Sequence, residues 1–378
     1  MQKNSNSLSK MAVPLKSNGR FYKENKTPLR TDFQRDRDRI IHSTAFRRLK
    51  HKTQVFVNTT GDHFRTRITH SLEVSQIART LSKFFKLNED LSETLSLAHD
   101  LGHTPFGHAG EEELNSCMEQ FGGFDHNIQT LRIVTILEKK YYNFEGLNLS
   151  LETLDGLIKH NGPINNLSNY NKILGSNFFK NKINFTSNAS LEAQIASISD
   201  DVAYNSHDLE DGLKANLFKL EDLIDIPILK EIIIKHNKYK KRHSKDLIIR
   251  QVIRDIINEM VKDLIKTTTK NIKIYNIQNL KDVYQSKKKI VTFSNKMKIF
   301  DKTIKKFLKN KMYYHIDVKK KTSHGKNVVK TLFYLIKKNP KKYININKYT
   351  HFKIERVICD YIAGMTDRYA INLYKKIK

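Results

Sequence analysis

Apolar residues recur every three or four positions along most of the chain, the spacing of one face of an α-helix. Residues 66–85 and 191–213 show this spacing most clearly, the second as a nearly unbroken apolar stripe. No segment shows the clear alternation of apolar and polar residues that a half-buried strand requires, and only residues 271–293 leave room for a short hairpin. The pattern therefore predicts an all-α fold, a helical bundle with at most a short hairpin.

Breaks and caps between the apolar runs divide the chain into further helices. Asp125 is a suitable N-cap, Asn161-Gly162-Pro163 is a strong C-terminal stop, and Pro227 suits the start of a helix. A polar, Asn-rich loop is expected after the stop, up to about residue 188. We expect helices at about 32–49, 66–85, 91–101, 108–121, 125–132, 151–162, 191–213, from Pro227 onward, and at 352–374.

The chain shows no internal repeat and no long Pro- or Gly-rich linker. Its composition divides it into a flexible N-terminal arm (1–30), a core (31–215) and a Lys-rich helical C-terminal region packed on that core (216–378). The polar N-terminus has no apolar run of signal-peptide type, and no segment has the roughly 18 consecutive apolar residues of a membrane span. We therefore expect a cytoplasmic protein without a membrane partner.

The net charge of +29 comes from 68 Lys and Arg against 39 Asp and Glu. Such an excess favours anionic partners such as nucleic acid or phosphorylated small molecules. A chain rich in Lys, Ile and Asn is also what an A/T-rich genome encodes, so the charge alone does not select a partner. Two cysteines, Cys117 and Cys359, cannot build a disulfide framework, and the apolar neighbours of Cys117 indicate a core thiol.

Candidate chemistry concentrates in residues 97–111. This stretch holds His99, Asp100, His103, His108 and Glu111, groups that ligate metals or transfer protons. A glycine at position 102 and a Thr-Pro pair at 104–105 break the preceding helix, so these side chains are expected to converge around a bend. His108 and Glu111 are three residues apart on one helix and can form an imidazole–carboxylate pair.

Two other helices carry polar residues on faces that would otherwise be apolar. His70 lies in the middle of the apolar face of 66–85, either as a satisfied core histidine or, with Arg67 one turn earlier, as part of a lined cavity. On 191–213 the face opposite the stripe carries Asp200, Tyr204 and Asp208. This face is either an acidic solvent surface or, because small alanines surround the acids, buried and in need of cations.

These residues suggest a metal site. His70, His99, Asp100 and Asp200 offer two imidazoles and two carboxylates, which suit one divalent ion among Mn, Mg, Fe, Co, Ni and Zn. The set has no thiolate, so a structural zinc site is excluded. Positive side chains would balance a polyphosphate, namely Arg67, His103, His126, and Arg47 and Arg48 if their charge-rich helix is a phosphate-facing edge rather than a solvated surface. The sequence thus predicts metal-dependent hydrolysis of a phosphate ester or anhydride.

The same residues carry a family resemblance. Arg67-Ile68-Thr69-His70, the run from His99-Asp100 to His108, and Asp200 resemble the H…HD…D signature of the HD phosphohydrolases. More narrowly, the chain is similar to the deoxyguanosine triphosphate triphosphohydrolases from about residue 12 onward. Further matching stretches are 35–43, 46–49, 52–56, 124–127, 159–163, 200–204, 207–208 and 360–368. The Lys-rich 220–350 region matches only at scattered positions such as Met312-Tyr313.

The resemblance implies a helical HD-domain bundle, with residues 31–215 as the HD catalytic core and additional C-terminal helices after it. It also implies that a deoxynucleoside triphosphate, dGTP or another dNTP, is hydrolysed to deoxynucleoside and inorganic triphosphate. By the resemblance, His70, His99, Asp100 and Asp200 are metal ligands, and His108 with Glu111 is the catalytic dyad, activating water or protonating the leaving 5′-oxygen. His103 and His126 would contact the α-phosphate and Arg67 the phosphates. Tyr204, Asp208 and Gln54 would contact the sugar.

Further partners and two other functions follow from the same reading. Family members form homo-oligomers and bind nucleotide effectors, and the basic charge adds single-stranded nucleic acid as a partner. One alternative function is an HD nucleotidase or phosphodiesterase of other specificity. The other is a non-enzymatic nucleic-acid-binding protein that retains the HD scaffold.

Overall fold

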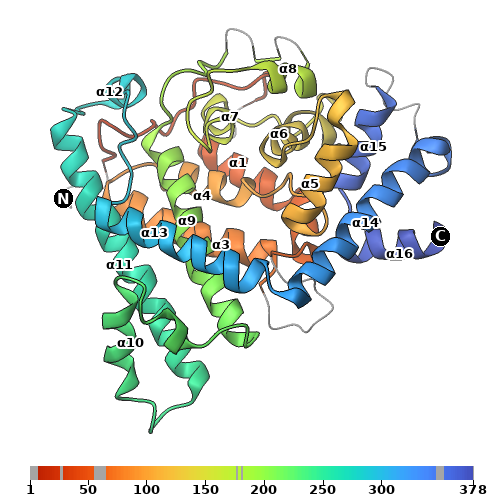
Figure 1. Cartoon of the computed structure of the whole chain (residues 1–378). Helices are drawn as coiled ribbons and strands as arrows, with labels where there is room; N and C mark the ends of the chain where they lie inside the picture. The colour runs from red at the N-terminus through yellow and green to blue at the C-terminus, as the bar shows by residue number, and fades with distance from the viewer. Residues whose placement is uncertain are drawn as a thin grey trace.

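The computed structural model describes residues 7–25, 29–54, 65–175, 178–179, 182–345 and 353–377, to which all structural statements below refer. These residues form helices joined by short connections, with three isolated β-bridges and no strand (Figure 1). The all-α prediction is confirmed. None of the helices in these ranges combines the length and the apolar character needed to cross a membrane.

Helices from the first 215 residues surround the centre of the molecule (Figure 1). Their bounds are α1 (Asp32–Ile41), α2 (Thr44–Arg48), η1 (Leu49–His51), α3 (Arg67–Phe84), α4 (Glu89–Ala98), α5 (Gly107–Cys117), η2 (Glu119–Phe121), α6 (His126–Arg132), η3 (Ile133–Leu137), α7 (Leu151–Ile158), α8 (Ser168–Leu174) and α9 (Leu191–Lys214).

Helix α9 runs through the protein and is buried on both sides. Its apolar stripe packs in a cluster with Val74 and Leu81 of α3, and its small Ala193 and Ala196 pack with residues of α4 and α7. Asp208 and Asp211 are only 1% and 2% exposed. The acidic face of this helix is therefore buried at Asp208 and Asp211, whereas the Asp200 side chain is 30% exposed.

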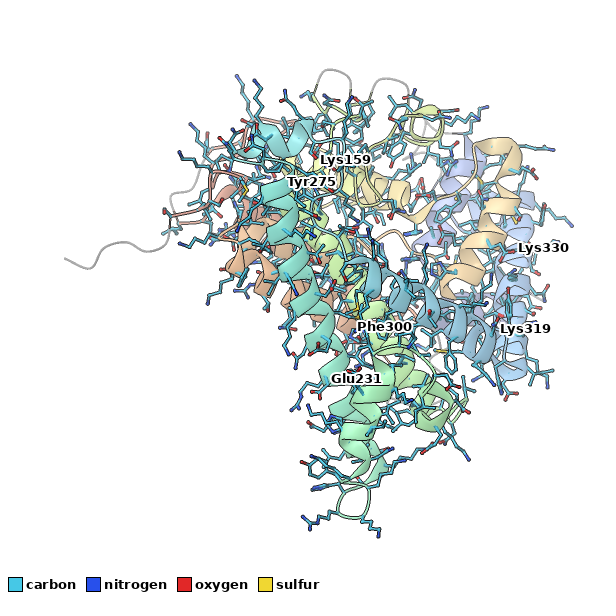
Figure 2. All side chains as sticks on the ribbon, turned by 60° about the vertical axis from the view of Figure 1, so that its left-hand side comes forward. Lys159, Glu231, Tyr275, Phe300, Lys319 and Lys330 are labelled. Carbon is cyan, nitrogen blue, oxygen red and sulfur yellow. The ribbon has the colours of Figure 1, made fainter. Side chains whose placement is uncertain are left out.

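The C-terminal region adds a second set of helices. Their bounds are η4 (Leu220–Leu223), α10 (Leu229–Asn237), α11 (Lys245–Ile274), α12 (Leu280–Gln285), α13 (Asn295–Leu308), η5 (Lys309–Tyr313), α14 (Ile316–Lys338), η6 (Pro340–Lys342), α15 (Ile354–Ala363) and α16 (Asp367–Ile377). Helix α10 and the start of α11 project from the body (Figure 1). In Figure 2, Glu231 labels the projecting helix α10, and Phe300 labels helix α13 in the body.

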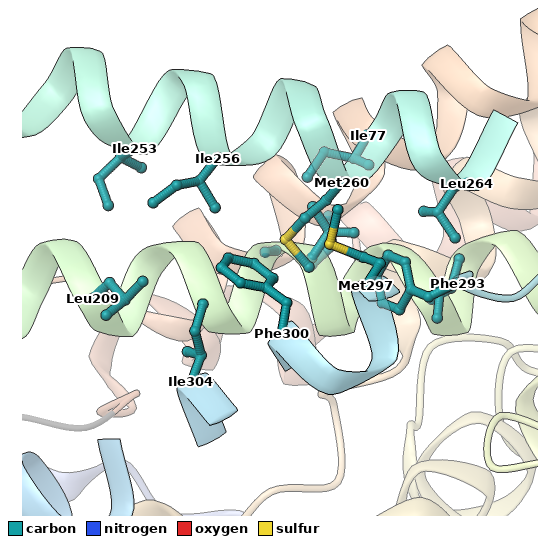
Figure 3. Packing of buried hydrophobic residues seen from close by; sticks show 14 of the residues in the cluster. Ile77, Leu209, Ile253, Ile256, Met260, Leu264, Phe293, Met297, Phe300 and Ile304 are labelled. Atoms are coloured by element: carbon teal, nitrogen blue, oxygen red, sulfur yellow. The ribbon is translucent and has the colours of Figure 1, made fainter. Parts of the chain in front are cut away.

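Helices α11 and α13 cover α9. Met260 of α11 and Phe300 of α13 are completely buried and meet beside α9, where Leu209 lies nearby (Figure 3). Helices α14, α15 and α16 share a separate apolar cluster with α5. In that cluster Gly325 of α14 has no side chain because a Cβ atom there would lie 2.7 Å from the Phe106 ring. The C-terminal region is thus packed on the helices that carry the candidate residues.

Several predicted element bounds were wrong. Residues 32–49 form two helices, because the Ser43 hydroxyl accepts from the Phe46 amide and starts α2 anew. The predicted last helix is interrupted at 364–366, between α15 and α16, and α7 ends at Ile158. The Asn-rich loop contains α8, and residues 271–293 hold the end of α11 and the helix α12 instead of a hairpin.

Residues 7–25, expected to be part of a flexible arm, are packed against the core. The Val13 side chain is 1% exposed and its amide donates to Glu192 Oε1 at 2.9 Å. The Arg20 guanidinium pairs with Asp36, which is completely buried. This segment is therefore held on the core by a few buried contacts and hydrogen bonds, while other side chains, such as Lys16 and Lys23, remain exposed.

Candidate active site

Two glycines shape the loop that leaves α4 and enters α5. A Cβ atom on Gly102 would lie 2.0 Å from the carbonyl oxygen of His126, so only glycine lets the loop pack on the backbone of α6. A Cβ atom on Gly110 would lie 1.9 Å from the carbonyl oxygen of Pro105, at the start of α5. The predicted bend is thus a close packing of backbone on backbone, and it directs several side chains of 99–111 to one region.

The four predicted metal ligands meet in the interior. His70, His99 and Asp100 each offer one metal-binding atom, these three atoms lie within 4.8 Å of one another, and all three residues are buried. Asp200 Oδ1 is 2.9 Å from His70 Nε2 and 3.7 Å from His99 Nε2. Helix α3, the loop after α4 and helix α9 therefore bring two imidazoles and two carboxylates together.

The state of His99 fits a metal ligand. Its Nδ1 lies 2.6 Å from the carbonyl oxygen of Ser96, an acceptor, so Nδ1 carries the proton and Nε2 keeps its lone pair. Within the described part of the chain this buried Nε2 has no hydrogen-bond partner. Burial lowers the pKa of His99, which keeps the ring neutral as a metal ligand must be.

Both carboxylates are held in their ionised form. Burial disfavours ionisation of Asp100, but the charge of Arg67 and the hydrogen bond from His103 outweigh it and hold the Asp100 pKa well below its usual range. The pKa of Asp200 is likewise well below its usual range, because His99, His160 and His70 outweigh its burial. Burial also opposes the protonation of His70, yet its hydrogen bond to Asp200 raises the His70 pKa. A metal ion would displace that proton.

Arg67 extends the site on one side of Asp100. Its Nη1 donates to Asp100 Oδ2 at 2.9 Å, whereas its buried Nε has no acceptor among the described residues. The backbone of Gln54 and the Arg67 guanidinium both lie beside Gly107, and the buried Gln54 Oε1 accepts no hydrogen bond from a residue that the structure describes. These are two unsatisfied groups that a polar ligand could reach.

A second cluster follows directly on the other side of Asp100. His103 Nε2 is 3.1 Å from Asp100 Oδ1, and the His103 ring stacks on His126 with centroids 4.0 Å apart. Burial, together with the Arg67 charge, lowers the pKa of His103 well below its usual range. His103, Glu111 and His126 also offer metal-binding atoms that lie within 4.8 Å of one another.

Glu111 lies between two histidines of this cluster. Its Oε1 is 2.8 Å from His126 Nδ1, and its Oε2 is 3.7 Å from His108 Nδ1. The His108 side chain is 71% exposed, whereas that of His126 is 24% exposed. Despite burial of its ring, the hydrogen bond to Glu111 raises the His126 pKa. The hydrogen bond expected between Glu111 and His108 is thus formed with His126 in this structure.

Tyr204 and Asp208 are joined by a residue of the C-terminal region. The Tyr313 hydroxyl in η5 donates to Asp208 Oδ2 and shares a hydrogen bond with the Tyr204 hydroxyl. Burial raises the pKa of Asp208 to about 7. Asp208 Oδ1 is buried and, within the described residues, accepts no hydrogen bond. The hydrogen bonds that link Tyr204, Tyr313 and Asp208 close the side of the site formed by α9.

Arg47 and Arg48 lie elsewhere. Arg47 is exposed, and Arg48 lines a cavity with Gln129 and Asp360 to which none of the four predicted metal ligands contributes. The side chains therefore diverge from the metal cluster, although the two arginines precede Gln54 by only a few residues.

Three residues near the site were given no role from the sequence. His160 stacks on His99 with centroids 5.4 Å apart and lies 3.7 Å from Asp200. His207 Nδ1 lies 3.4 Å from His70 Nδ1. Tyr313 was only one of the scattered positions in the Lys-rich region. The only sequence evidence for these three residues was that they lie in short stretches that match the family, and no metal-binding or catalytic motif next to them indicated a role.

Comparison with known proteins agrees with this geometry. The HD domain matches residues 67–205, which include every predicted metal ligand, and the phosphohydrolase-associated domain matches residues 291–376. A deoxyguanosinetriphosphate triphosphohydrolase-like protein of Pelagibacter ubique is 58% identical over 98% of this chain and the whole of that protein. Proteins of the same name are 45% identical in Bartonella tribocorum, over 97% of this chain and 94% of theirs, and 44% identical in Rickettsia rickettsii, over 96% of both. With such identity along nearly the full length, and an HD domain that spans the clustered histidines and carboxylates, this chain belongs to the HD-domain family of deoxyguanosinetriphosphate triphosphohydrolase-like proteins, which are phosphohydrolases.

Proposed function

We propose that this protein hydrolyses a deoxynucleoside triphosphate to the deoxynucleoside and inorganic triphosphate with the help of one divalent metal ion. The observation that supports the proposal most is the meeting of His70, His99, Asp100 and Asp200 beside a second cluster of histidines. The relatives bear the name deoxyguanosinetriphosphate triphosphohydrolase-like protein, which refers to a reaction of this type.

His70, His99, Asp100 and Asp200 would hold the metal ion. When bound, a divalent ion in such a site supplies Lewis acidity to a phosphoryl oxygen and lowers the pKa of water. The protein supplies the protonation states that binding requires, namely ionised carboxylates and a neutral His99 whose Nε2 is free. Hydrogen bonding of His99 to the Ser96 carbonyl fixes the ring orientation.

The second cluster would act on the α-phosphate. Arg67, His103 and His126 lie next to Asp100 and would bind phosphate oxygens, with the unsatisfied Arg67 Nε as one donor. Glu111 holds a proton on His126, and His108 stands 3.7 Å from the same carboxylate. One of these two imidazoles would activate water or protonate the leaving 5′-oxygen, since both are within reach of a carboxylate that stabilises the imidazolium.

Tyr204, Asp208 and Gln54 would recognise the sugar. Asp208 Oδ1 and Gln54 Oε1 are buried acceptors without donors in the described structure, and a sugar hydroxyl is the donor that each lacks. Tyr204 is held by Tyr313, and a phenol ring fixed under the sugar would exclude a 2′-hydroxyl. This arrangement would favour deoxynucleotides over ribonucleotides.

The test is a panel of the four dNTPs assayed with each divalent metal, with products resolved by chromatography. Tripolyphosphate and deoxynucleoside are expected, and in ¹⁸O-water the label should enter the tripolyphosphate if water attacks the α-phosphorus. His99→Ala and Asp200→Ala should lose metal and activity while keeping helical circular dichroism. His236→Ala is the matched control, because His236 is a buried histidine that pairs with Asp255 away from the site and should keep both.

The products separate the proposal from its alternatives. Orthophosphate or pyrophosphate as the only inorganic product would instead indicate an HD nucleotidase or phosphodiesterase of another specificity. Absence of turnover with every metal, combined with DNA binding that weakens steeply with salt, would favour a non-enzymatic nucleic-acid-binding protein. Turnover retained in His99→Ala or Asp200→Ala would refute the ligand assignment.

A further inference from the structure

A cavity of about 530 Å³ lies beside helix α6, apart from the residues of the proposed reaction. It is bounded by α2, α6, η3 and the segment that joins α15 to α16, and its size is in the range of small-molecule sites. Its wall combines apolar and polar side chains, among them Ile133, Val357, Met365, Arg48, Gln129 and Asp360. The apolar ones are buried core residues, so the cavity extends into the protein interior.

Arg48 is a cation of this wall that makes no hydrogen bond and no close ion pair in the described structure. Its buried Nε has no acceptor there. Burial of the side chain lowers the Arg48 pKa, and the charge of Glu138, which lines the same cavity, only partly offsets this effect. A guanidinium in such a place is costly unless an anion joins it.

The other charged groups of the wall already have partners. Asp360 receives hydrogen bonds from Arg132, at 2.9 Å from Nε to Oδ1, and Glu138 accepts from the backbone amides at the start of α2. Lys139 pairs with Glu145. Arg48 is therefore the charged group of the wall whose N–H groups still lack an acceptor in the described structure, although Glu138 contributes a negative charge to the same wall. An oxyanion would supply that acceptor.

Gln129 is a second, independent unsatisfied group. Its side chain is 1% exposed, and its Nε2 donates to Asp360 Oδ1 at 3.1 Å. Because a carboxylate oxygen can only accept, this contact fixes the orientation of the amide and leaves its Oε1 without a donor. Buried polar atoms of this kind ordinarily have a partner, which a ligand would supply here.

We propose that this cavity binds a small molecule with an oxyanion head group on an apolar body. The head group would accept hydrogen bonds from Arg48, for which phosphate, phosphonate and carboxylate groups are suited by geometry. A singly protonated phosphate or phosphonate would in addition donate its hydroxyl to Gln129 Oε1, which a carboxylate cannot do. The body would lie against Val357 and Met365. The inference is independent of the proposed reaction and does not use its residues.

The test uses the full chain labelled with ¹³C-methyl methionine, in which Met365 reports on the cavity. The chain has seven methionines, and Met365→Leu identifies the Met365 signal. Phenylphosphonate and benzoate carry a phosphonate and a carboxylate head group, respectively, on the same phenyl ring. Benzyl alcohol carries this ring without an anionic group. We expect a saturable shift of the Met365 signal with at least one of the anions and none with benzyl alcohol. No shift with either anion, or an equal shift with benzyl alcohol, would overturn the proposal.

Two variants that remove one arginine each test the head-group contact. Arg48→Met should weaken binding of the anion at least about tenfold. Arg47→Met removes the same charge from the exposed neighbour and should leave the affinity unchanged. Equal affinity in Arg48→Met and the unchanged protein, or equal losses in both variants, would refute the assignment. If Arg48→Met does not fold, as judged by circular dichroism, Val357→Phe fills the cavity with Arg48 in place and should abolish the Met365 shift.

Discussion

Asp367 at the start of α16 ties the C-terminal region to the loop that carries His103. Its Oδ1 accepts from the Phe106 amide at 3.0 Å, and its Oδ2 accepts from the Thr53 amide at 3.0 Å and from the Thr53 hydroxyl. Asp367 is 2% exposed, so water does not replace these bonds. Phe106 has φ of +63°, a left-handed conformation that a bulky residue adopts only when its surroundings impose it.

Asp367→Ala would leave two buried backbone amides without an acceptor. At about 1–3 kcal/mol for each unsatisfied donor, the loss is roughly 3 kcal/mol or more. For 378 residues the unfolding entropy is about 0.8 kcal/mol per kelvin, so this loss lowers the melting temperature by roughly 4 °C. Release of the Phe106 conformation would also shift His103, and a displacement of about 1 Å costs on the order of 100-fold in rate.

The assay combines thermal unfolding with amide hydrogen exchange. The Phe106 amide should be protected in the unchanged protein and should exchange rapidly in Asp367→Ala. Thr366→Ala is the matched control, because it removes a side-chain cap of the same helix, the hydroxyl that accepts from the Tyr369 amide, and leaves Asp367 in place. A difference of about 1 °C corresponds to about 0.8 kcal/mol on this scale. If Asp367→Ala melts within that difference of Thr366→Ala and keeps the Phe106 amide protected, Asp367 does not hold the Phe106 loop in place.

Three further predictions concern the same site. Burial raises the pKa of Asp208 to about 7, against an ordinary value of about 3.9, so between about pH 4 and 7 only the folded state holds this proton. The free energy of unfolding therefore falls as the pH rises through that window, by on the order of 4 kcal/mol at most. Asp208→Asn should reduce the difference between the denaturation midpoints at pH 5 and pH 8, and an unchanged difference would contradict the assignment. Tyr313→Phe removes the hydroxyl between Tyr204 and Asp208 and should raise the dNTP KM about tenfold with a smaller change in kcat, whereas an unchanged KM in steady-state assays would count against a role in sugar binding. Gly102→Ala should cost about 3 kcal/mol or more, seen as a lower melting temperature, because its Cβ atom would overlap the His126 carbonyl; a normal melting temperature would show that the loop can move away.

Regular periodicity made much of this fold predictable from the sequence. The helix predicted at 66–85 is α3 to within a residue or two, and the stripe at 191–213 is α9. The burial of the acids on α9 followed from the alanines between them, because small residues admit a neighbouring helix. The four ligand positions lie on the two most regular helices and on the bend between α4 and α5, so their convergence was within reach of sequence reasoning.

Features that depend on tertiary contacts were not predictable in this way. Asp360 and Asp367 lie on one continuous helical pattern in the sequence, yet the chain breaks at 364–366 and the Asp367 carboxylate faces Phe106 and Thr53. Arg47 and Arg48 are adjacent in a charge-rich run, but one is exposed and the other lines a cavity. Nothing in a single sequence says which side of a short helix such as α2 will face another element 300 residues later.

The catalytic core and the C-terminal region are best regarded as one unit. The completely enclosed Lys52 ammonium group donates to the carbonyl oxygens of His103 and Ala363, joining a residue of the second cluster to the end of α15. Tyr313 completes the α9 side of the site, and Asp367 fixes the loop on the opposite side. Because Tyr313, Ala363 and Asp367 all lie beyond residue 215, a fragment ending near residue 215 would keep the four ligand residues but would lose groups that hold Asp208, Phe106 and His103 in place. The additional helices are therefore required for the geometry of the site.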